Sequence, residues 1–241
     1  MEKETIDYTC SSTQISGMSK NAFESYLFKD GKPMALTSLN KSDEAPFQYG
    51  HLSLKAILAV RDKRLAQTID TVLLYNGRGF TRFNTGMEST SSTGQSGKNY
   101  THAPLFWLSV IYLNYAEACA ELGNITQDDL DKSINLLKDR AGLPHLNPIV
   151  GFSDPANNHG VSDLIWEIRR ERRCELMFDN DNRYWDLIRW HQLDKLDTTK
   201  YPDIILGANV ANDMDGCEAN KVGKYIDGSK DGSRIYDKKH Y

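Results

Sequence analysis

Long hydrophobic runs are missing from this chain of 241 residues. Its most apolar stretch, APLFWLSVIYL at 103–113, contains a proline and a serine. Because a membrane-spanning helix needs roughly 18 or more consecutive apolar residues, the sequence predicts no transmembrane segment. The opening MEKETIDYTC has no apolar core, so it is not typical of a secretory signal peptide. No apolar stretch precedes Cys10, as a lipoprotein signal would require.

The chain also lacks a large excess of charge of either sign. Lys and Arg number 29 and Asp and Glu number 33, which gives a net charge of -4 and a pI near 5.9. Nucleic-acid-binding domains usually show a basic excess or a basic stripe, so we expect no nucleic-acid partner. With 39% hydrophobic and 26% charged residues, the composition indicates a globular protein with one large or two small cores.

Cysteine and closely spaced histidine are scarce, and several kinds of site are therefore not expected. Four cysteines are too few for a disulfide scaffold. Cys119 and Cys174 lie in helical patterns and are predicted to be reduced core thiols, whereas Cys10 and Cys217 could pair or stay free. No two histidines share a helical turn, and NDMDGCE at 212–218 lacks two ligand positions of a calcium loop. The sequence predicts no metal and no cofactor.

Helical periodicity dominates the second half of the chain. It predicts helices over 105–122, 128–142, 161–179 and 183–196. The first is apolar almost all round, so we expect a buried central helix. Gly142 is a predicted stop for the second, and Ser162 or Asp163 a predicted cap for the third. All four tryptophans lie in segments with a helical pattern and are predicted to be core residues: Trp107, Trp166, Trp185 and Trp190.

The first half is more irregular and is predicted to contain fewer elements. We expect a turn at 29–33, a helix within 51–69, and strands at 71–77 and 79–84 joined by an Asn76-Gly77 turn. The predicted organisation is an irregular leader, 1–20, and one domain, 21–241. That domain would comprise a Ser/Thr/Gly-rich loop at 84–101, a helical core at 105–196, and an irregular tail of turns and short strands at 197–241.

The densest charge pattern lies in the third predicted helix. Glu167 and Arg170, and Arg172 and Glu175, are spaced i,i+3 and can pair. Glu117 stands on an otherwise apolar helix, so it needs a charged partner, which the Arg-rich helix could supply. Glu171 and Glu175 could be the carboxylate pair of a glycoside hydrolase. Structural ion pairing is favoured instead, since an arginine within one turn lowers the pKa that a general acid needs.

Aromatic residues outside the helices are the candidates for ligand contact. Exposed rings beside Arg and Asn side chains can stack on sugar faces and hydrogen-bond hydroxyl groups. The alternative is that these rings alternate in short strands and cover the helical core. The candidate ligand-binding residues are Tyr75, Asn76, Arg78, Phe80, Arg82, Phe83, Phe47 and Tyr49.

Five segments in this order resemble one known family. They are YLFKDGKP (26–33), Asp62-Lys63-Arg64-Leu65, LNYAEACAELG (113–123), LKDRAGL (137–143) and ERRCELMFDNDNRYWDLIRW (171–190). On these motifs residues 21–241 are similar to the C-terminal half of the SusD/RagB family of surface glycan-binding lipoproteins. The resemblance implies a mainly α fold, a tetratricopeptide-like helical scaffold with long loops and a few short β-strands.

The same resemblance implies a protein without catalytic activity. Such a protein captures oligosaccharides, or peptides in some branches, for a SusC-like TonB-dependent transporter on the Bacteroidetes outer-membrane surface. The family's amino-terminal half, lipid-anchored cysteine and terminal segment are expected to lie outside this chain. The matched motifs imply scaffold contacts, and no catalytic role, for Glu117, Arg172, Glu175, Arg183, Asp186 and Arg189.

The sequence therefore leaves three functions open. Glycan capture in polysaccharide utilisation rests on the five matched segments. A helical-repeat module that binds only protein is suggested by the antiparallel helix pairs. A glycoside hydrolase is suggested by the carboxylates of the third predicted helix.

Overall fold

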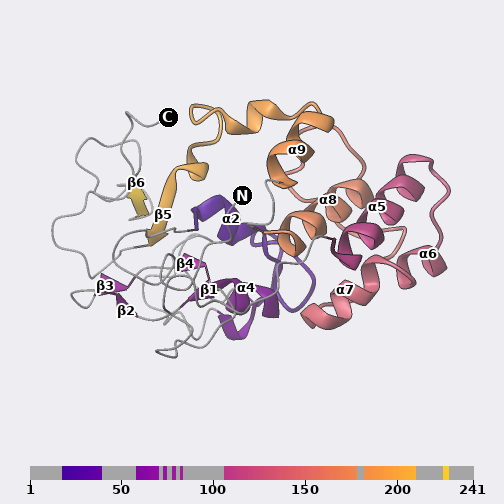
Figure 1. The fold of residues 1–241 in the computed structure, drawn as a ribbon, viewed down its shortest axis with the longest axis horizontal. Helices are drawn as coiled ribbons and strands as arrows, with labels where there is room; N and C mark the ends of the chain where they lie inside the picture. Colours follow the sequence, from indigo (N-terminus) through magenta and orange to yellow (C-terminus); the bar gives the residue numbers. More distant parts are fainter. Residues whose placement is uncertain are drawn as a thin grey trace.

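The structure, a computed structural model, describes residues 18–39, 58–70, 73–74, 78–79, 82–83, 106–177, 182–209 and 225–227. Helices α5 to α9 lie on one side, the strand pairs on the other, and helices α2 and α4 between them (Figure 1). The described part of the chain is mostly helical with a few short strands. The predicted mainly α fold is therefore confirmed.

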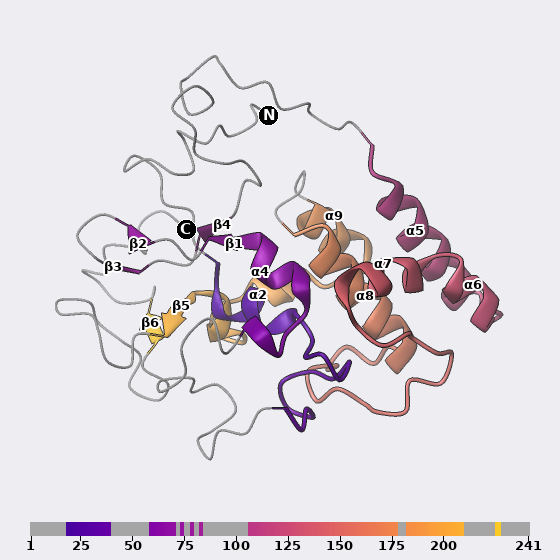
Figure 2. The same cartoon turned by 90° about the horizontal axis from the view of Figure 1, so that it is seen from below.

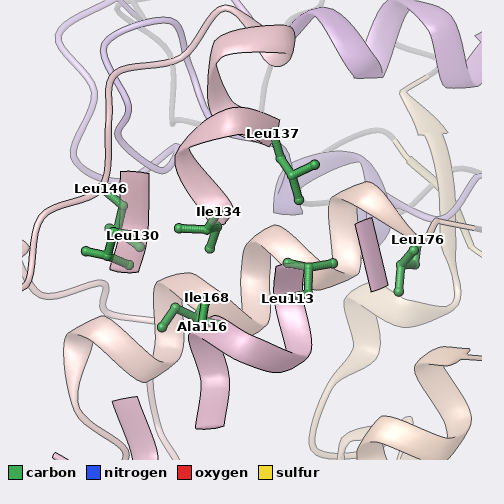
Figure 3. Packing of buried hydrophobic residues seen from close by; sticks show 8 residues of the cluster. All are labelled: Leu113, Ala116, Leu130, Ile134, Leu137, Leu146, Ile168 and Leu176. Carbon is green, nitrogen blue, oxygen red and sulfur yellow. The ribbon is translucent and has the colours of Figure 1, made fainter. Parts of the chain in front are cut away.

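The main hydrophobic core lies among four helices. These are α5 (Leu108–Glu121), α6 (Gln127–Asp131), α7 (Ile134–Ala141) and α8 (Asp163–Glu175). Figure 3 shows side chains of α6 and α7 directed toward those of α5 and α8. Each fully buried leucine or isoleucine contributes roughly 1.5–3 kcal/mol relative to exposure. The buried cluster comprises Leu113, Ala116, Leu130, Ile134, Leu137, Leu146, Ile168 and Leu176.

Capping residues fix the ends of these helices. Thr126 caps α6 in a capping box with Asp129. At the start of α8 the Ser162 hydroxyl accepts a hydrogen bond from the backbone N–H of Ile165, so the predicted cap is present. Gly142 ends α7 in the left-handed region at φ 71°, as predicted for a residue without a Cβ.

The single helix predicted over 128–142 is wrong, because α6 and α7 replace it. The break lies at Ser133, whose φ of -132° and ψ of -97° are not helical. Its hydroxyl donates to the carbonyl oxygen of Asp129, four residues earlier, and competes with the helical hydrogen bonds. The predicted apolar face is nevertheless buried on both sides of the break: Leu130, Ile134, Leu137 and Ala141.

The helix predicted over 183–196 is also wrong at its carboxyl end. α9 spans Asn182–Arg189, and a 3-10 helix, η2 (Leu193–Leu196), follows it. Between the two, His191 takes a positive φ of 54°. Neither glycine nor proline marks this end in the sequence, so the periodic pattern continued through it.

The amino-terminal elements are joined through a buried arginine. α2 (Lys20–Ser25) and α4 (Lys63–Thr68) flank the antiparallel bridge between Phe28 and Arg61. The Arg61 guanidinium donates to the carbonyl oxygen of Tyr26 at 2.7 Å and lies 4.4 Å from the Phe28 ring centroid. A guanidinium can be buried in this way because both ring contact and hydrogen bonding compensate its lost hydration.

Two local predictions for this region are confirmed. The turn expected at 29–33 is present, with Gly31 at φ 75° and its N–H donating to the carbonyl oxygen of Phe28 at 2.8 Å. The helix expected within 51–69 is present as α4.

Short antiparallel strands form three pairs among the described residues. The first two pairs share one register, in which paired positions are equally distant from residue 76. A two-residue Asn76-Gly77 turn would instead pair Leu74 with Gly79, so the register differs by one residue from the one that the predicted turn requires. The third pair lies after residue 197, where short strands were predicted. The pairs are β1 (Ile69–Asp70) with β4 (Arg82–Phe83), β2 (Leu73–Leu74) with β3 (Arg78–Gly79), and β5 (Leu206–Asn209) with β6 (Tyr225–Asp227).

The prediction that α5 is buried all round is wrong. Its inner residues Leu113 and Ala116 are buried against the other helices, but Leu108 is 63% exposed and Ile111 is 61% exposed. Figure 2 shows α5 at the edge of the molecule. Neighbouring helices therefore cover one side of α5 and leave an apolar outer side.

Candidate functional site

Most of the predicted ligand-binding residues lie outside the described part of the chain. These are Phe47, Tyr49, Tyr75, Asn76 and Phe80. The backbone of Arg78 lies in β3, and the backbone of Arg82 and Phe83 in β4. Their role in ligand binding stays a prediction. Residues 1–17 of the predicted leader 1–20, the predicted loop 84–101, Cys10, Cys217 and the calcium-like stretch 212–218 also lie outside the described residues.

A chain of ion pairs joins α5, α8 and α9. The Nε of Arg172 donates to both Asp186 carboxylate oxygens at 2.9 and 2.7 Å. The Nε of Arg189 donates to the same carboxylate at 2.8 Å, and its Nη2 contacts Glu117 at 2.5 Å. Four of the predicted scaffold residues thus form one continuous network of opposite charges, which satisfies carboxylates that would be costly to bury alone.

Glu117 on α5 has partners on both of the following long helices. Arg169 of α8 lies 3.4 Å from Glu117, and the indole N–H of Trp190 donates to Glu117 at 2.6 Å. Arg169 also contacts Glu121 at 3.1 Å. The Arg-rich helix therefore supplies a partner, as predicted, but the shortest charged contact comes from Arg189 on α9.

A second network surrounds the carboxylates that the hydrolase hypothesis requires. Glu171 contacts Arg64 and lies 3.4 Å from Lys138. Burial raises the pKa of Glu171, but the attraction of Arg64 and Lys138 outweighs it and lowers this pKa to about 2. Glu175 contacts Arg64 at 3.0 Å and also contacts Arg140.

Two predicted ion-pair contacts differ in the structure. Arg172 and Glu175 do not pair with each other, because each finds its partner on another element. Arg183, for which the resemblance implies a scaffold contact, forms no ion pair with a carboxylate of the described residues. Its guanidinium instead lies 5.8 Å from the ring centroid of Trp190, and burial lowers its pKa to about 9.

The carboxylates of α8 are unsuited to acid–base catalysis as they stand. A general acid needs a pKa near the working pH and access to the substrate. Glu171 is ionised and only 2% exposed. Burial raises the pKa of Glu167 to about 8, but this group is equally inaccessible and forms the predicted pair with Arg170 at 3.2 Å. These groups therefore stabilise the scaffold.

An exposed aromatic pair on α9 is the feature that sequence reasoning missed. Trp185 is 62% exposed and Tyr184 is 50% exposed, and their rings meet edge to face with centroids 5.8 Å apart. The prediction of a core position is wrong for Trp185, and for Trp107, which is also exposed. Asp186 and Leu187 are the buried positions of α9, and helical spacing leaves the pair on the opposite side.

Where the structure describes the chain, no cluster of three or more His, Cys, Asp or Glu residues could hold a metal ion. Across those same ranges, no helix combines the length and the apolar character that a membrane span requires.

Helices joined by buried ion pairs, with exposed rings on the outside, make up the described scaffold. The sequence model of the SusD family matches residues 70–239, most of the chain, and the protein belongs to this family. Members of the family are nutrient-binding components of the outer membrane and in general act without catalysis.

Structural comparison gives a further likeness. The solved structure named BT4246 is similar with a TM-score of 0.48 and 23% sequence identity, over 74% of this chain and 34% of that one. The protein therefore spans about a third of the length of that structure. No curated protein sequence matches this chain.

Proposed function

We propose that the protein captures oligosaccharides at the outer-membrane surface and delivers them to a SusC-like TonB-dependent transporter. The supporting observation is its membership of the SusD family over residues 70–239. In this proposal the complete protein is held at the surface by a lipid anchor, serves polysaccharide utilisation in Bacteroidetes, and has no nucleic-acid partner.

The pairing of buried carboxylates with basic side chains, among the described residues, supports a binding function without catalysis. The carboxylates of α8 and α9 that lie inside the scaffold are paired with arginine or lysine. Removing such groups from their partners would be expensive, so they serve the fold rather than a substrate. Ligand contact then belongs to surface residues. Tyr75, Phe80 and Phe83 with Asn76, Arg78 and Arg82, and Phe47 with Tyr49, remain the proposed contacts of the loops and hairpin.

A second candidate function is a module that binds only protein, or a branch of the family that binds peptides. The observation that favours it is the apolar outer side of α5, where Leu108, Ile111 and Leu122 are exposed. Aliphatic surface of this kind suits a protein neighbour better than a sugar.

The proposal is tested on the complete protein with a panel of plant and bacterial oligosaccharides and a panel of peptides, by titration calorimetry. We expect binding of at least one oligosaccharide and no peptide. Binding of peptides alone would support the second candidate. Turnover of a chromogenic glycoside that Glu171→Gln abolishes would show that the protein is a hydrolase.

A further inference from the structure

We infer that Tyr184 and Trp185 of α9 form a stacking platform for a pyranose ring, separate from the proposed hairpin contacts. This inference rests on the proposed capture of oligosaccharides and adds a site to it. The two rings stand at 68° to each other, so they present a corner rather than a flat patch. A pyranose ring has a flat C–H face that packs on an aromatic ring and an equatorial edge of hydroxyl groups, and both can contact such a corner.

The platform is held rigid by its neighbours in the sequence. Asp186 follows Trp185 directly and accepts hydrogen bonds from Arg172 and Arg189. Arg183 precedes Tyr184 and lies over the indole of Trp190. Both flanking side chains are thus fixed to the interior. A rigid helix that carries the rings in this way loses little conformational entropy when a ligand binds.

The polar groups of Tyr184 and Trp185 differ from those of the inner tryptophans in having no hydrogen-bond partner among the described residues. The indole N–H of Trp190 donates to Glu117 at 2.6 Å, and that of Trp166 donates to Asp154 at 3.0 Å. Toward the described residues, neither the indole N–H of Trp185 nor the hydroxyl of Tyr184 makes a hydrogen bond. These two groups are therefore available to sugar hydroxyl groups, as is common for tyrosine and tryptophan at binding surfaces.

The exposed side of α5 does not offer the same chemistry. Its exposed side chains at 108, 111 and 122 are aliphatic, and the hydroxyl of Tyr115 already donates to Asp129 at 2.5 Å. A sugar needs a planar apolar face with free polar groups beside it. The pair on α9 meets this requirement. Phe106 and Trp107 are also exposed at the start of α5, so Trp107 is the exposed ring with which the pair is compared.

The test compares variants of Trp185 in the complete protein, with an oligosaccharide that the wild-type protein binds in the calorimetric panel. Trp185→Phe keeps a planar ring, whereas Trp185→Leu keeps an apolar side chain without one. We expect affinity within about threefold of wild type for Trp185→Phe and a loss of about tenfold or more for Trp185→Leu, as for truncation of an aromatic anchor. Tyr184→Ala should also weaken binding. Trp107→Ala, on another exposed tryptophan, is the matched control and should bind as wild type does.

The melting midpoint of each variant separates binding from packing. Because both rings are exposed, Trp185→Leu should leave the midpoint unchanged. Equal affinity of Trp185→Phe and Trp185→Leu, or a large fall in the midpoint of the latter, would overturn the platform while the capture of oligosaccharides stands. A wild-type protein that binds no oligosaccharide would overturn both.

Discussion

At the scale of single residues, Glu171 shows how a buried charge ties stability to pH. Its pKa is about 2 in the folded protein, against an ordinary value of 4.5, because Arg64 and Lys138 outweigh the effect of burial. The folded state therefore keeps this carboxylate ionised at pH values where the unfolded state protonates it. The resulting stabilisation is fully present above pH 4.5 and is lost as the pH falls from there toward 2.

We expect Glu171→Gln to lower the free energy of unfolding by about 3 kcal/mol at pH 7, and by much less near pH 2.5. Urea unfolding at pH 7, 5 and 2.5 measures this difference. Glu121→Gln, which removes a half-exposed carboxylate, is the control and should change stability by less than about 1 kcal/mol throughout. A constant difference between Glu171→Gln and wild type across the pH range would show that Glu171 is not held ionised.

Cys174 is a second residue whose environment fixes its chemistry. The thiol is buried and contacts the carbonyl oxygen of Ser25 at 3.4 Å, and burial raises its pKa to about 12. Since the thiolate is the reactive form, we expect a protein with Cys174 as its only cysteine to resist a thiol reagent at pH 8 until it is unfolded. A protein that keeps only Cys119, which is partly exposed, should react faster when folded. Equal rates for the two folded proteins would contradict the buried position.

At the scale of elements, the contact of Arg172 with Asp186 joins α8 to α9. Both side chains are buried, and Arg172 also donates to Asn114 of α5 at 2.9 Å. Removal of either partner leaves an uncompensated buried charge, so Arg172→Ala and Asp186→Ala should each cost about 3–5 kcal/mol. The double variant should cost less than the sum of the two, which a double-mutant cycle of chemical denaturation measures.

The exposed pair of Lys132 with Asp128 serves as the control for that cycle. Its side chains are 70% and 69% exposed, and its removal should leave stability nearly unchanged because solvent screens the pair. Additive costs for Arg172→Ala and Asp186→Ala would mean that the two groups act independently in solution.

Some helix ends could be predicted from the sequence and others could not. The starts of α6 and α8 follow from the local chemistry of Thr126 and Ser162, and such chemistry is visible in the sequence. The break at Ser133 and the end of α9 depend on a serine back-bond and a positive φ at His191, which periodicity does not contain. Helical periodicity in the sequence predicts where a helix lies, but the position of its end can be predicted only where a capping residue marks it.

The candidate site was harder to predict than the fold. Ion-pair partners such as Arg64 and Glu171 are far apart in the sequence, so charge spacing within one helix suggested the wrong partner for Glu175. The exposure of Trp185 depends on which neighbours cover α9, and hydrophobicity alone placed it in the core. Tertiary contacts decide both, and they are not local properties of the sequence.

At the scale of the whole molecule, we propose that residues 21–241 form one domain, in which the amino-terminal elements and the helices fold as one unit. Arg64 of α4 is one of the links between them. Its guanidinium contacts Asp62 of its own segment and Glu171 and Glu175 of α8. The hydroxyl of Tyr26 adds a hydrogen bond to the carbonyl oxygen of Cys174 at 3.3 Å. The buried guanidinium of Arg64 thus contacts three carboxylates, which come from two parts of the chain.

Arg64→Met should therefore uncouple the two parts as well as destabilise the protein. The substitution keeps the apolar stem but leaves three carboxylates short of a counter-charge, at a cost of about 3–5 kcal/mol. In wild type, amide hydrogen exchange should protect Leu65 in α4 and Ile168 in α8 to the same free energy, as expected for one cooperative unit. In Arg64→Met, protection at Leu65 should fall further than at Ile168, since the core around α5, α7 and α8 does not depend on Arg64. Lys63→Met, on the exposed side of α4, is the matched control and should change neither. An equal loss of protection at both positions in Arg64→Met would mean that contacts other than Arg64 couple the two parts.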